Sequence, residues 1–315
     1  MGLDYVESLG DGVYVVDTGL IRPRFDAAFL IVERGRAAFV DTGSNHAVPR
    51  LLAALAETGL SPACVEYVIP THMHLDHAGG MGLLMQSLPN ATVLVHPRGA
   101  RHAIDPSALY RGALAIYGPE VMASTYGVPC AVDAERVRST QEGMTIDLGG
   151  RALRFMDTPG HARHHHCIWD ERTRGWFSGD TFGTSYREFD TARGPWIIPA
   201  ATPVQFDPEA MQASVRRLLQ AGPVCMYMTH FGRLGEVGLL AESLARQIDD
   251  MVALALALPP TATTVDALKS GLAALYRRSL HEHGVLDLDE GIRTLSLDIE
   301  LNALGLAHWL GERAA

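Results

Sequence analysis

Short apolar runs rich in β-branched and aromatic residues alternate along this chain with segments of helical period. Residues 13–17 (VYVVD), 27–33 (AAFLIVE) and 37–41 (AAFVD) are separated by glycine and polar turns, which predicts that the chain opens with a strand meander. Residues 47–58 then repeat leucine at the spacing of one helix face. Alternation of this kind predicts helices packed on the outside of β-sheets.

The same alternation continues to about residue 232 and then changes. Further strands are predicted at residues 65–69, 91–95, 144–146, 152–156, 167–170 and 224–228. An irregular, aromatic stretch predicts a helical insertion at about 97–130. Beyond Gly232 only helical periodicity remains, with predicted helices at about 236–258, 264–281 and 288–310 and Pro259-Pro260 between the first two. We therefore predict an α/β domain of residues 1–232 and a C-terminal helical region of residues 233–315.

Composition and charge narrow the classes of function. Of the 315 residues, 47% are hydrophobic and 20% are charged, which is typical of a globular protein. A formal charge of −10 argues against DNA, RNA or an anionic membrane surface as a partner. The N-terminus lacks a basic region followed by an apolar one, and no apolar run approaches the roughly 20 residues that span a membrane. The four cysteines form no CxxC pair, so we expect a cytoplasmic protein with reduced thiols.

The strongest chemical signal is the run HMHLDH at residues 72–77, directly after a predicted strand and directly before Gly79-Gly80. Histidines two residues apart on an extended segment point to the same side, and a turn into a helix brings the next Asp and His from another direction. Imidazole and carboxylate groups are ligands of zinc and related divalent metals. Each of three further candidate ligands follows a predicted strand: His161, Asp180 and His230. Since one ion needs about four ligands, this set has enough donors for two ions.

In this order and at these strand ends, the motifs resemble the metallo-β-lactamase superfamily over about residues 8–232. The matching elements are Asp41 in VDTG, the HMHLDH run, His161 in TPGH, Asp180 in SGD, and His230. The resemblance implies a catalytic domain with the four-layer αββα fold, in which two mixed sheets face each other, helices cover both outer faces and the site lies along one edge. It also implies the ligand sets: His72, His74 and His161 for one metal, Asp76, His77 and His230 for the other, and Asp180 as the bridge.

Within the superfamily, the pattern looks most like the glyoxalase II type, because the full HxHxDH run and the bridging Asp occur without a Cys ligand. The stretch TPGHARHHHC and the tail segment DIELNALGLAHWL also look like a group of uncharacterised hydrolase-like members. Asp41 is expected to orient the ligand loop and its imidazoles, with helix capping as the alternative. His165 matches a recurrent histidine of the glyoxalase II pattern and is expected beside the ligands. On a strand, alternate members of His164–His166 would face the site, and their roles stay open.

The expected chemistry is hydrolysis at a carbonyl carbon. Two divalent ions lower the pKa of a shared water toward about 7, which supplies a bridging hydroxide as nucleophile at neutral pH. We expect a thioester, ester or lactone as the small-molecule substrate, with Asp76 or Asp180 handling the proton. Phe182, Tyr186 and Trp196 are candidates for the substrate pocket, with core packing as the alternative. Zinc is the first expectation for the metals, and iron and manganese are alternatives.

Two other functions fit parts of the same pattern. A mononuclear iron oxidoreductase similar to the persulfide dioxygenases would use two His and one Asp of the same scaffold, but here the donors of a second site are all present. A phosphodiesterase or nuclease of the superfamily is disfavoured by the charge of −10. The oligomeric state is open, and a homodimer would use the insertion or the helical tail.

Overall fold

The structure is a computed structural model that describes residues 2–201, 203–258 and 264–314. The chain divides into two compact units. The first unit consists of Met1–Asp157, His164–Gly179 and Pro223–Gly235, and the second of Thr158–Arg163, Asp180–Gly222 and Glu236–Ala315. All named strands belong to the first unit. The predicted domain boundary after residue 232 stays a prediction, and Pro259-Pro260 lies outside the described residues.

The first sheet begins as an antiparallel meander and continues as a parallel sheet. Its strands follow chain order from β1 to β7, with antiparallel pairs up to β4 and parallel pairs from β4 onward. They are β1 (Val6–Gly10), β2 (Val13–Asp17), β3 (Ala27–Glu33), β4 (Arg36–Val40), β5 (Val65–Ile69), β6 (Thr92–Val95) and β7 (Val137–Ser139). Because β4 and β5 are parallel, the segments that follow them leave the sheet at the same edge.

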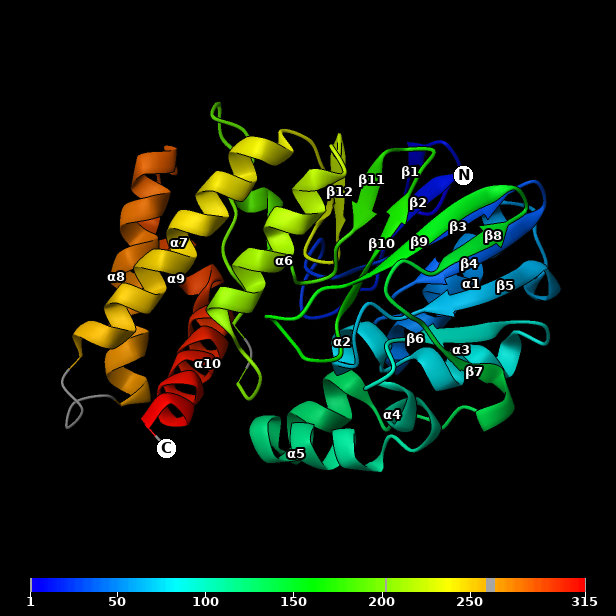
Figure 1. Cartoon of the computed structure of the whole chain (residues 1–315), viewed down its shortest axis with the longest axis horizontal. Helices are drawn as coiled ribbons and strands as arrows, with labels where there is room; N and C mark the ends of the chain where they lie inside the picture. The colour runs from blue at the N-terminus through cyan, green and yellow to red at the C-terminus, as the bar shows by residue number, and fades with distance from the viewer. Residues whose placement is uncertain (1, 202, 259–263, 315) are drawn as a thin grey trace. The chain divides into compact units, whose positions relative to one another are not determined.

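The second sheet has the order β13-β12-β11-β10-β9-β8 and is antiparallel except for the pair of β11 and β12. Its strands are β8 (Thr145–Leu148), β9 (Arg151–Asp157), β10 (His166–Asp170), β11 (Gly175–Phe177), β12 (Cys225–Met228) and β13 (Gly232–Leu234). Figure 1 shows both sheets of the first unit.

An aromatic core joins the two sheets. The ring of Phe29 in β3 lies 5.3 Å from that of Phe177 in β11 and 5.7 Å from that of Tyr227 in β12, measured between centroids. All three side chains are buried in one cluster with aliphatic residues of both sheets. Full burial of one such side chain contributes about 1.5–3 kcal/mol, so this core fixes the sheets face to face.

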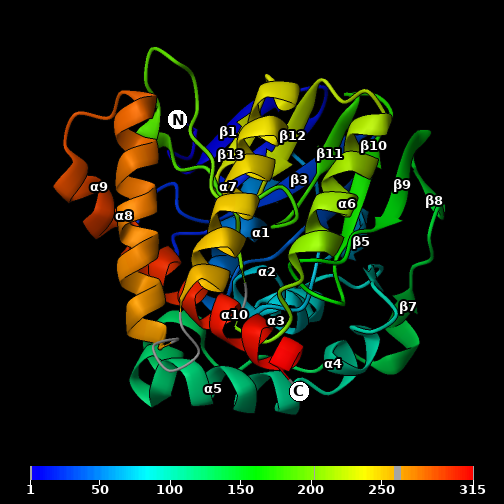
Figure 2. The ribbon, with the colours of Figure 1, turned by 60° about the vertical axis from the view of Figure 1, so that its left-hand side comes forward.

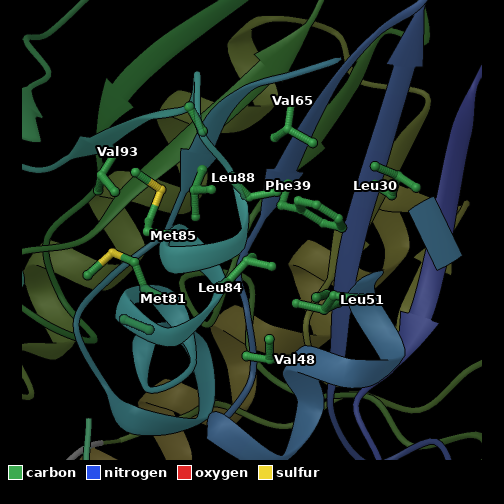
Figure 3. Packing of buried hydrophobic residues seen from close by; sticks show 14 of the residues in the cluster. Leu30, Phe39, Val48, Leu51, Val65, Met81, Leu84, Met85, Leu88 and Val93 are labelled. Atoms are coloured by element: carbon green, nitrogen blue, oxygen red, sulfur yellow. The ribbon is translucent and has the colours of Figure 1, made fainter. Parts of the chain in front are cut away.

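Helices cover the other face of the first sheet. Leu51 of α1 (Val48–Glu57) and Leu84 of α3 (Met81–Ser87) belong to one buried cluster with Leu30 and Phe39 of the sheet (Figure 3). The remaining helices of the first unit are α2 (Leu75–Ala78), α4 (Ala100–Ile104) and α5 (Ser107–Val121). The last two lie in the segment for which a helical insertion was predicted.

The second unit is helical, and side chains cap the first turns of α6 and α8. Asp207 accepts the N–H of Ala210 at 3.0 Å, and Thr264 accepts the N–H of Ala267 at 3.1 Å, each satisfying an otherwise unpaired amide of the first turn. Figure 2 shows α8 beside α7 and α10, with which it packs. The helices are α6 (Pro208–Gln220), α7 (Val237–Ala257), α8 (Val265–His283), α9 (Leu288–Thr294) and α10 (Ser296–Ala314).

The structure departs from the predicted elements at short strands and at one helix. The strand pattern does not end at Gly232, because β13 begins there and pairs with β12. Three residues are too few to show an alternating pattern. The predicted helix at 288–310 is two helices, since the backbone leaves helical geometry at the fully buried Leu295. Among the helices of the described residues, none has the length and apolar character that a membrane span requires.

A buried ion pair joins β9 to β10 and reaches the first sheet. Arg151 Nε donates to Asp170 Oδ1 at 2.9 Å, and neither side chain is exposed. Arg151 also donates to the carbonyl of Asp11, in the turn between β1 and β2, at 2.6 Å. This guanidinium therefore fixes the register of the two sheets at the end of β10 that is remote from His166.

Replacing Asp170 with Ala should lower the free energy of unfolding by about 3–5 kcal/mol, because Arg151 would stay buried without its counter-charge. Urea unfolding followed by circular dichroism measures this change. The control is Arg172→Ala, which removes a half-exposed side chain that pairs with Glu33 at 2.7 Å and should cost less than about 1 kcal/mol. Equal losses in the two variants would contradict the role of the buried pair.

Candidate metal centre

Three strands of the first unit deliver polar residues to one edge. Asp41 follows β4, His72 follows β5 after Pro70 and Thr71, and His230 follows β12 after Thr229. The two sheets are tied together at this edge, because the N–H of Ala27 donates to the carbonyl of Thr229 at 2.8 Å. The strand ends therefore bring together side chains that lie far apart in the sequence.

The HMHLDH run holds its histidines close to one another. His74 is extended and directly precedes α2, and His72 Nε2 lies 2.7 Å from His74 Nδ1. His77 is in α2, and its ring centroid lies 4.0 Å from that of His72. Three imidazoles thus come from an extended segment and the following helical turn, as the spacing predicts.

Asp76, His77 and His230 form a group with the geometry of a metal-binding site. One ligand atom from each residue lies within 4.8 Å of the others. Asp76 Oδ2 is 3.6 Å from His77 Nε2 and 3.5 Å from His230 Nε2. One carboxylate and two imidazoles are a donor set suited to zinc, iron or manganese. The donor set therefore fits a divalent cation.

Partners on the far side of each ring select the imidazole tautomer. His77 Nδ1 donates to Asp41 Oδ2 at 2.8 Å, and His230 Nδ1 donates to the carbonyl of Phe25 at 2.7 Å. In both rings the proton is therefore on Nδ1, so that the lone pair of Nε2 faces Asp76. Outer hydrogen bonds of this kind orient metal-binding histidines and raise their basicity.

Asp41 lies fully buried behind these ligands. Its carboxylate accepts the backbone N–H of Thr71 at 2.6 Å, the hydroxyl of Thr71 at 3.0 Å and the hydroxyl of Thr229 at 2.8 Å, besides the His77 ring. Its φ is +58°, a left-handed conformation that costs a non-glycine residue about 1 kcal/mol or more. The predicted orienting role stays a prediction with these contacts in its favour.

His161 and Asp180 belong to the second unit and lie close together within it. His161 Nε2 is 3.4 Å from Asp180 Oδ2. His161 Nδ1 donates to the carbonyl of Ala200 at 2.9 Å, so Nε2 is again the nitrogen that carries the lone pair. Both side chains are buried. His161 therefore resembles His77 and His230, because Nδ1 of each ring donates a hydrogen bond to an acceptor.

The run His164–His166 differs from the predicted strand. β10 begins only at His166; His164 lies in a turn and His165 in no regular element, so strand alternation does not apply to them. The rings of His164 and His165 both stack near His72, at 6.2 and 4.9 Å between centroids. His166 turns elsewhere: Nε2 donates to the carbonyl of Pro70 and Nδ1 accepts from Thr140, both at 2.9 Å.

The aromatic residues predicted for the substrate pocket are buried within the second unit. Phe182 has no exposed surface, and Tyr186 donates its hydroxyl to Asp298 at 2.9 Å. Trp196 donates its indole N–H to Ser279 at 2.9 Å. These contacts are those of packing residues, and a contact with substrate stays a prediction for each of them.

Asp26 is a buried acid near the ligands that the sequence analysis missed. Its side chain has no exposed surface and accepts the hydroxyl of Thr18. Burial raises the pKa of Asp26 to about 7, although His230 and His77 act in the opposite direction. An Asp directly before an apolar strand carries no motif of its own. The contacts of its neighbours connect this segment to the candidate centre, Phe25 with His230 and Ala27 with Thr229.

A family model described as the metallo-beta-lactamase superfamily matches residues 21–230. The chain belongs to this superfamily. The metallo-beta-lactamase fold-containing protein ST1585 of Sulfurisphaera tokodaii is 27% identical over 172 residues, which are 53% of this chain and 61% of that protein. Hydroxyacylglutathione hydrolase of Xanthomonas campestris is 28% identical over 214 residues, or 64% and 68% of the two chains. The match thus spans less than two thirds of the first relative's length.

Solved structures of the superfamily have the same fold. The metallo-beta-lactamase family protein TTHA1429 of Thermus thermophilus superposes with a TM-score of 0.67 at 21% identity, covering 98% of this chain and 96% of that one. The predicted fold class, an α/β sandwich of the metallo-β-lactamase type with C-terminal helices, is confirmed. Members of this superfamily are mostly hydrolytic metalloenzymes, and the fold typically binds divalent metals.

The buried His166 should make stability depend on pH. Burial, helped by nearby His96, lowers the pKa of His166 to about 3 from its usual 6.5. The unfolded chain therefore binds a proton near pH 6.5 that the native state does not bind until near pH 3. Neutral His166 therefore makes its full contribution to the free energy of unfolding above pH 6.5. This contribution declines by up to about 1.4 kcal/mol per pH unit as the pH falls toward 3.

The variant His166→Gln has no titratable group at this position. The difference in unfolding free energy between wild type and variant should therefore shrink as the pH is lowered. Urea unfolding at pH 7.5, 6.0 and 5.0 measures this difference. A value that stays constant over these three pH values would show that His166 does not titrate as its burial predicts.

Proposed function

We propose that this chain is a metal-dependent hydrolase that uses two divalent cations to cleave a carboxylic thioester, ester or lactone. The observation that carries the proposal is the group of Asp76, His77 and His230, whose donor atoms lie within 4.8 Å of one another. Both imidazoles of this group are held through Nδ1 by outer acceptors, which leaves Nε2 for a cation. A purely structural cluster would not require the same tautomer at each ring.

The full ligand set follows the arrangement that the superfamily motifs imply. In this proposal Asp76, His77 and His230 would hold one cation, and His72, His74 and His161 would hold the other. Asp180 would be a ligand shared between the two sets. The Ala200 contact, which places the lone pair of His161 on Nε2, supports this assignment. We propose zinc as the metal, with iron or manganese as alternatives that fit the same donors.

The residues divide the chemical work between them. When bound, two divalent cations lower the pKa of water toward about 7 and polarise a carbonyl oxygen, so the chain needs no nucleophile of its own. Asp76 exposes 24% of its side chain, whereas its partners His77 and His230 expose 0% and 5%. Asp76 is therefore the carboxylate that a leaving group would reach, and we assign it the proton transfer, with Asp180 as the second acid.

A thioester is the first substrate class to test. Its support is the 28% identity to a hydroxyacylglutathione hydrolase over 64% of this chain. The glyoxalase II-like subgroup stays a prediction, since basic residues that would bind glutathione are few and Arg277-Arg278 is the one basic pair in the tail sequence. We propose a small-molecule substrate in the cytoplasm, and no nucleic-acid or membrane partner, from the charge of −10. A homodimer stays an expectation that light scattering would measure.

The variant Asp180→Ala should lower kcat/KM for the best substrate by about 100-fold or more, because loss of even an outer ligand partner costs 10–100-fold. Its metal content should also fall. Wild-type and variant proteins are first quantified for bound metals and then assayed on thioesters, lactones, aryl esters and phosphodiesters. The control is Asp250→Ala, which removes an exposed carboxylate of α7 and should change neither value.

Three outcomes would contradict the proposal. Hydrolysis at the full rate by metal-free protein would show that the reaction does not need the cations. Cleavage confined to phosphodiesters would indicate the nuclease branch of the superfamily. Oxygen consumption with glutathione persulfide, by protein holding one iron, would indicate an oxidoreductase instead.

A further inference from the structure

Residues 197–201 of the second unit carry the backbone acceptor of a candidate metal ligand. The carbonyl of Ala200 in this segment accepts the Nδ1–H of His161 at 2.9 Å. The position of this carbonyl therefore sets both the tautomer and the direction of the ring. The segment has no regular secondary structure apart from an isolated bridge between Ile198 and Thr184. Other contacts must therefore hold its backbone in place.

Asn302 of α10 bonds to the backbone on both sides of Ala200. Its Oδ1 accepts the N–H of Ala201 at 2.7 Å, and its Nδ2 donates to the carbonyl of Pro199 at 3.0 Å. Nδ2 also donates to the hydroxyl of Tyr276, in α8, at 2.7 Å. These partners fix the orientation of the side-chain amide, because the flipped amide would set donor against donor at Ala201 and acceptor against acceptor at Pro199.

Two further contacts connect α7 to the same arrangement. The hydroxyl of Tyr276 donates to Met251 Sδ at 3.5 Å, so this hydroxyl accepts from Asn302 on one side and donates on the other. Gln247 donates its side-chain amide to the carbonyl of Ile197. Helices α7, α8 and α10 thus hold one segment, and all of these residues belong to the second unit.

Asn302 is a polar residue on an apolar helix face. Its side chain is 2% exposed, and Ile299, Ala303 and Leu306, which share the face by helical spacing, are all buried. Alanine or leucine would form the helix more readily and would need no hydrogen-bond partners when buried. Packing alone therefore does not require an amide at this position, whereas holding the backbone around Ala200 does.

We propose that Asn302 is a positioning residue of the metal centre, which acts on His161 through the carbonyl of Ala200. This inference rests on the proposed function, because it takes His161 as a metal ligand. The rings of His77 and His230 belong to the first unit and have other acceptors, so they are oriented independently of Asn302. The C-terminal helices therefore control the affinity for one cation and not for the other.

The test is the zinc affinity of Asn302→Leu, which keeps a branched side chain and removes its hydrogen bonds. Metal-free, full-length protein is titrated with zinc in competition with a chromophoric chelator, and the wild type should bind two ions per chain. In the variant the Kd of one ion should rise about tenfold, as for loss of an outer contact of a metal-binding histidine, and the other Kd should not change. His161→Ala identifies the affected ion, because it should weaken the same one.

A second measurement needs no metal. In the metal-free protein, the Nδ1 proton of His161 should give a slowly exchanging imidazole signal in the proton NMR spectrum, assigned by its absence in His161→Gln. Asn302→Leu should lose this signal through faster exchange with water, because the Ala200 carbonyl is no longer held.

Tyr276→Phe keeps the test decisive if Asn302→Leu does not fold. This variant keeps the aromatic ring and both backbone contacts of Asn302 and removes one hydroxyl. It should raise the Kd of the same zinc ion about twofold to threefold, at the low end of the effect of one neutral hydrogen bond. Unchanged affinity for both ions in this variant would then overturn the inference.

Glu300→Gln is the matched control, since it removes another polar contact between α10 and α8, the ion pair with Lys269, and should leave both Kd values unchanged. If Asn302→Leu binds both zinc ions as the wild type does, or binds both equally more weakly, the inference is wrong and the proposed hydrolase stands. If His161→Ala changes neither Kd, the inference and the proposed function both fail. If the wild type with two zinc ions cleaves no thioester, ester or lactone, the proposed hydrolase alone fails.

Discussion

The candidate centre depends on a single buried carboxylate. Asp41 accepts hydrogen bonds from the backbone and side chain of Thr71, from the His77 ring and from Thr229. These donors come from the loop after β5, from α2 and from the end of β12. A buried carboxylate needs hydrogen-bond donors to replace its lost hydration, and here each donor belongs to a segment that carries a metal-ligand candidate. The left-handed backbone of Asp41 is the conformational cost of placing one acceptor among all of them.

His230 and His161 are also held by a hydrogen bond from Nδ1, but their acceptors are backbone carbonyls and not a carboxylate. Backbone carbonyls of Phe25 and Ala200 fix the tautomers of His230 and His161 as the Asp41 carboxylate fixes that of His77. A carboxylate raises the basicity of its ring more than a neutral carbonyl does. The ring of His77 is therefore expected to be the strongest donor among these three.

Much of the fold, and the closeness of the HMHLDH imidazoles, could be predicted because both follow from local pattern. The strand at 65–69 was placed to the residue, and the spacing of HMHLDH brings its imidazoles together without reference to the rest of the chain. The outer acceptors at Phe25 and Ala200 are main-chain carbonyls, which every residue possesses, so no side-chain pattern marks them. The Tyr117–Tyr126 ring contact spans the break in helical geometry at Gly118 and a π-helical turn, where ordinary helical spacing does not apply.

Errors arose where the local pattern was weak or uniform. Three consecutive histidines have no alternation to read, so the start of β10 at His166 was not visible in the sequence. A buried leucine such as Leu295 suits a helix interior, and its role as a helix break follows from packing around it. The start of β10 and the helix break at Leu295 depend on tertiary contacts, which a single sequence does not display.

The Arg151–Asp170 pair gives the sandwich a second polar end. β3 runs from Ala27, bonded to Thr229 beside His230, to Glu33, which pairs with Arg172 next to Asp170. The apolar aromatic core separates these ends, and the turn that follows Glu33 is exposed at Arg34 and Gly35. A surface linker attached to that turn would thus immobilise the protein with its candidate metal centre facing solution.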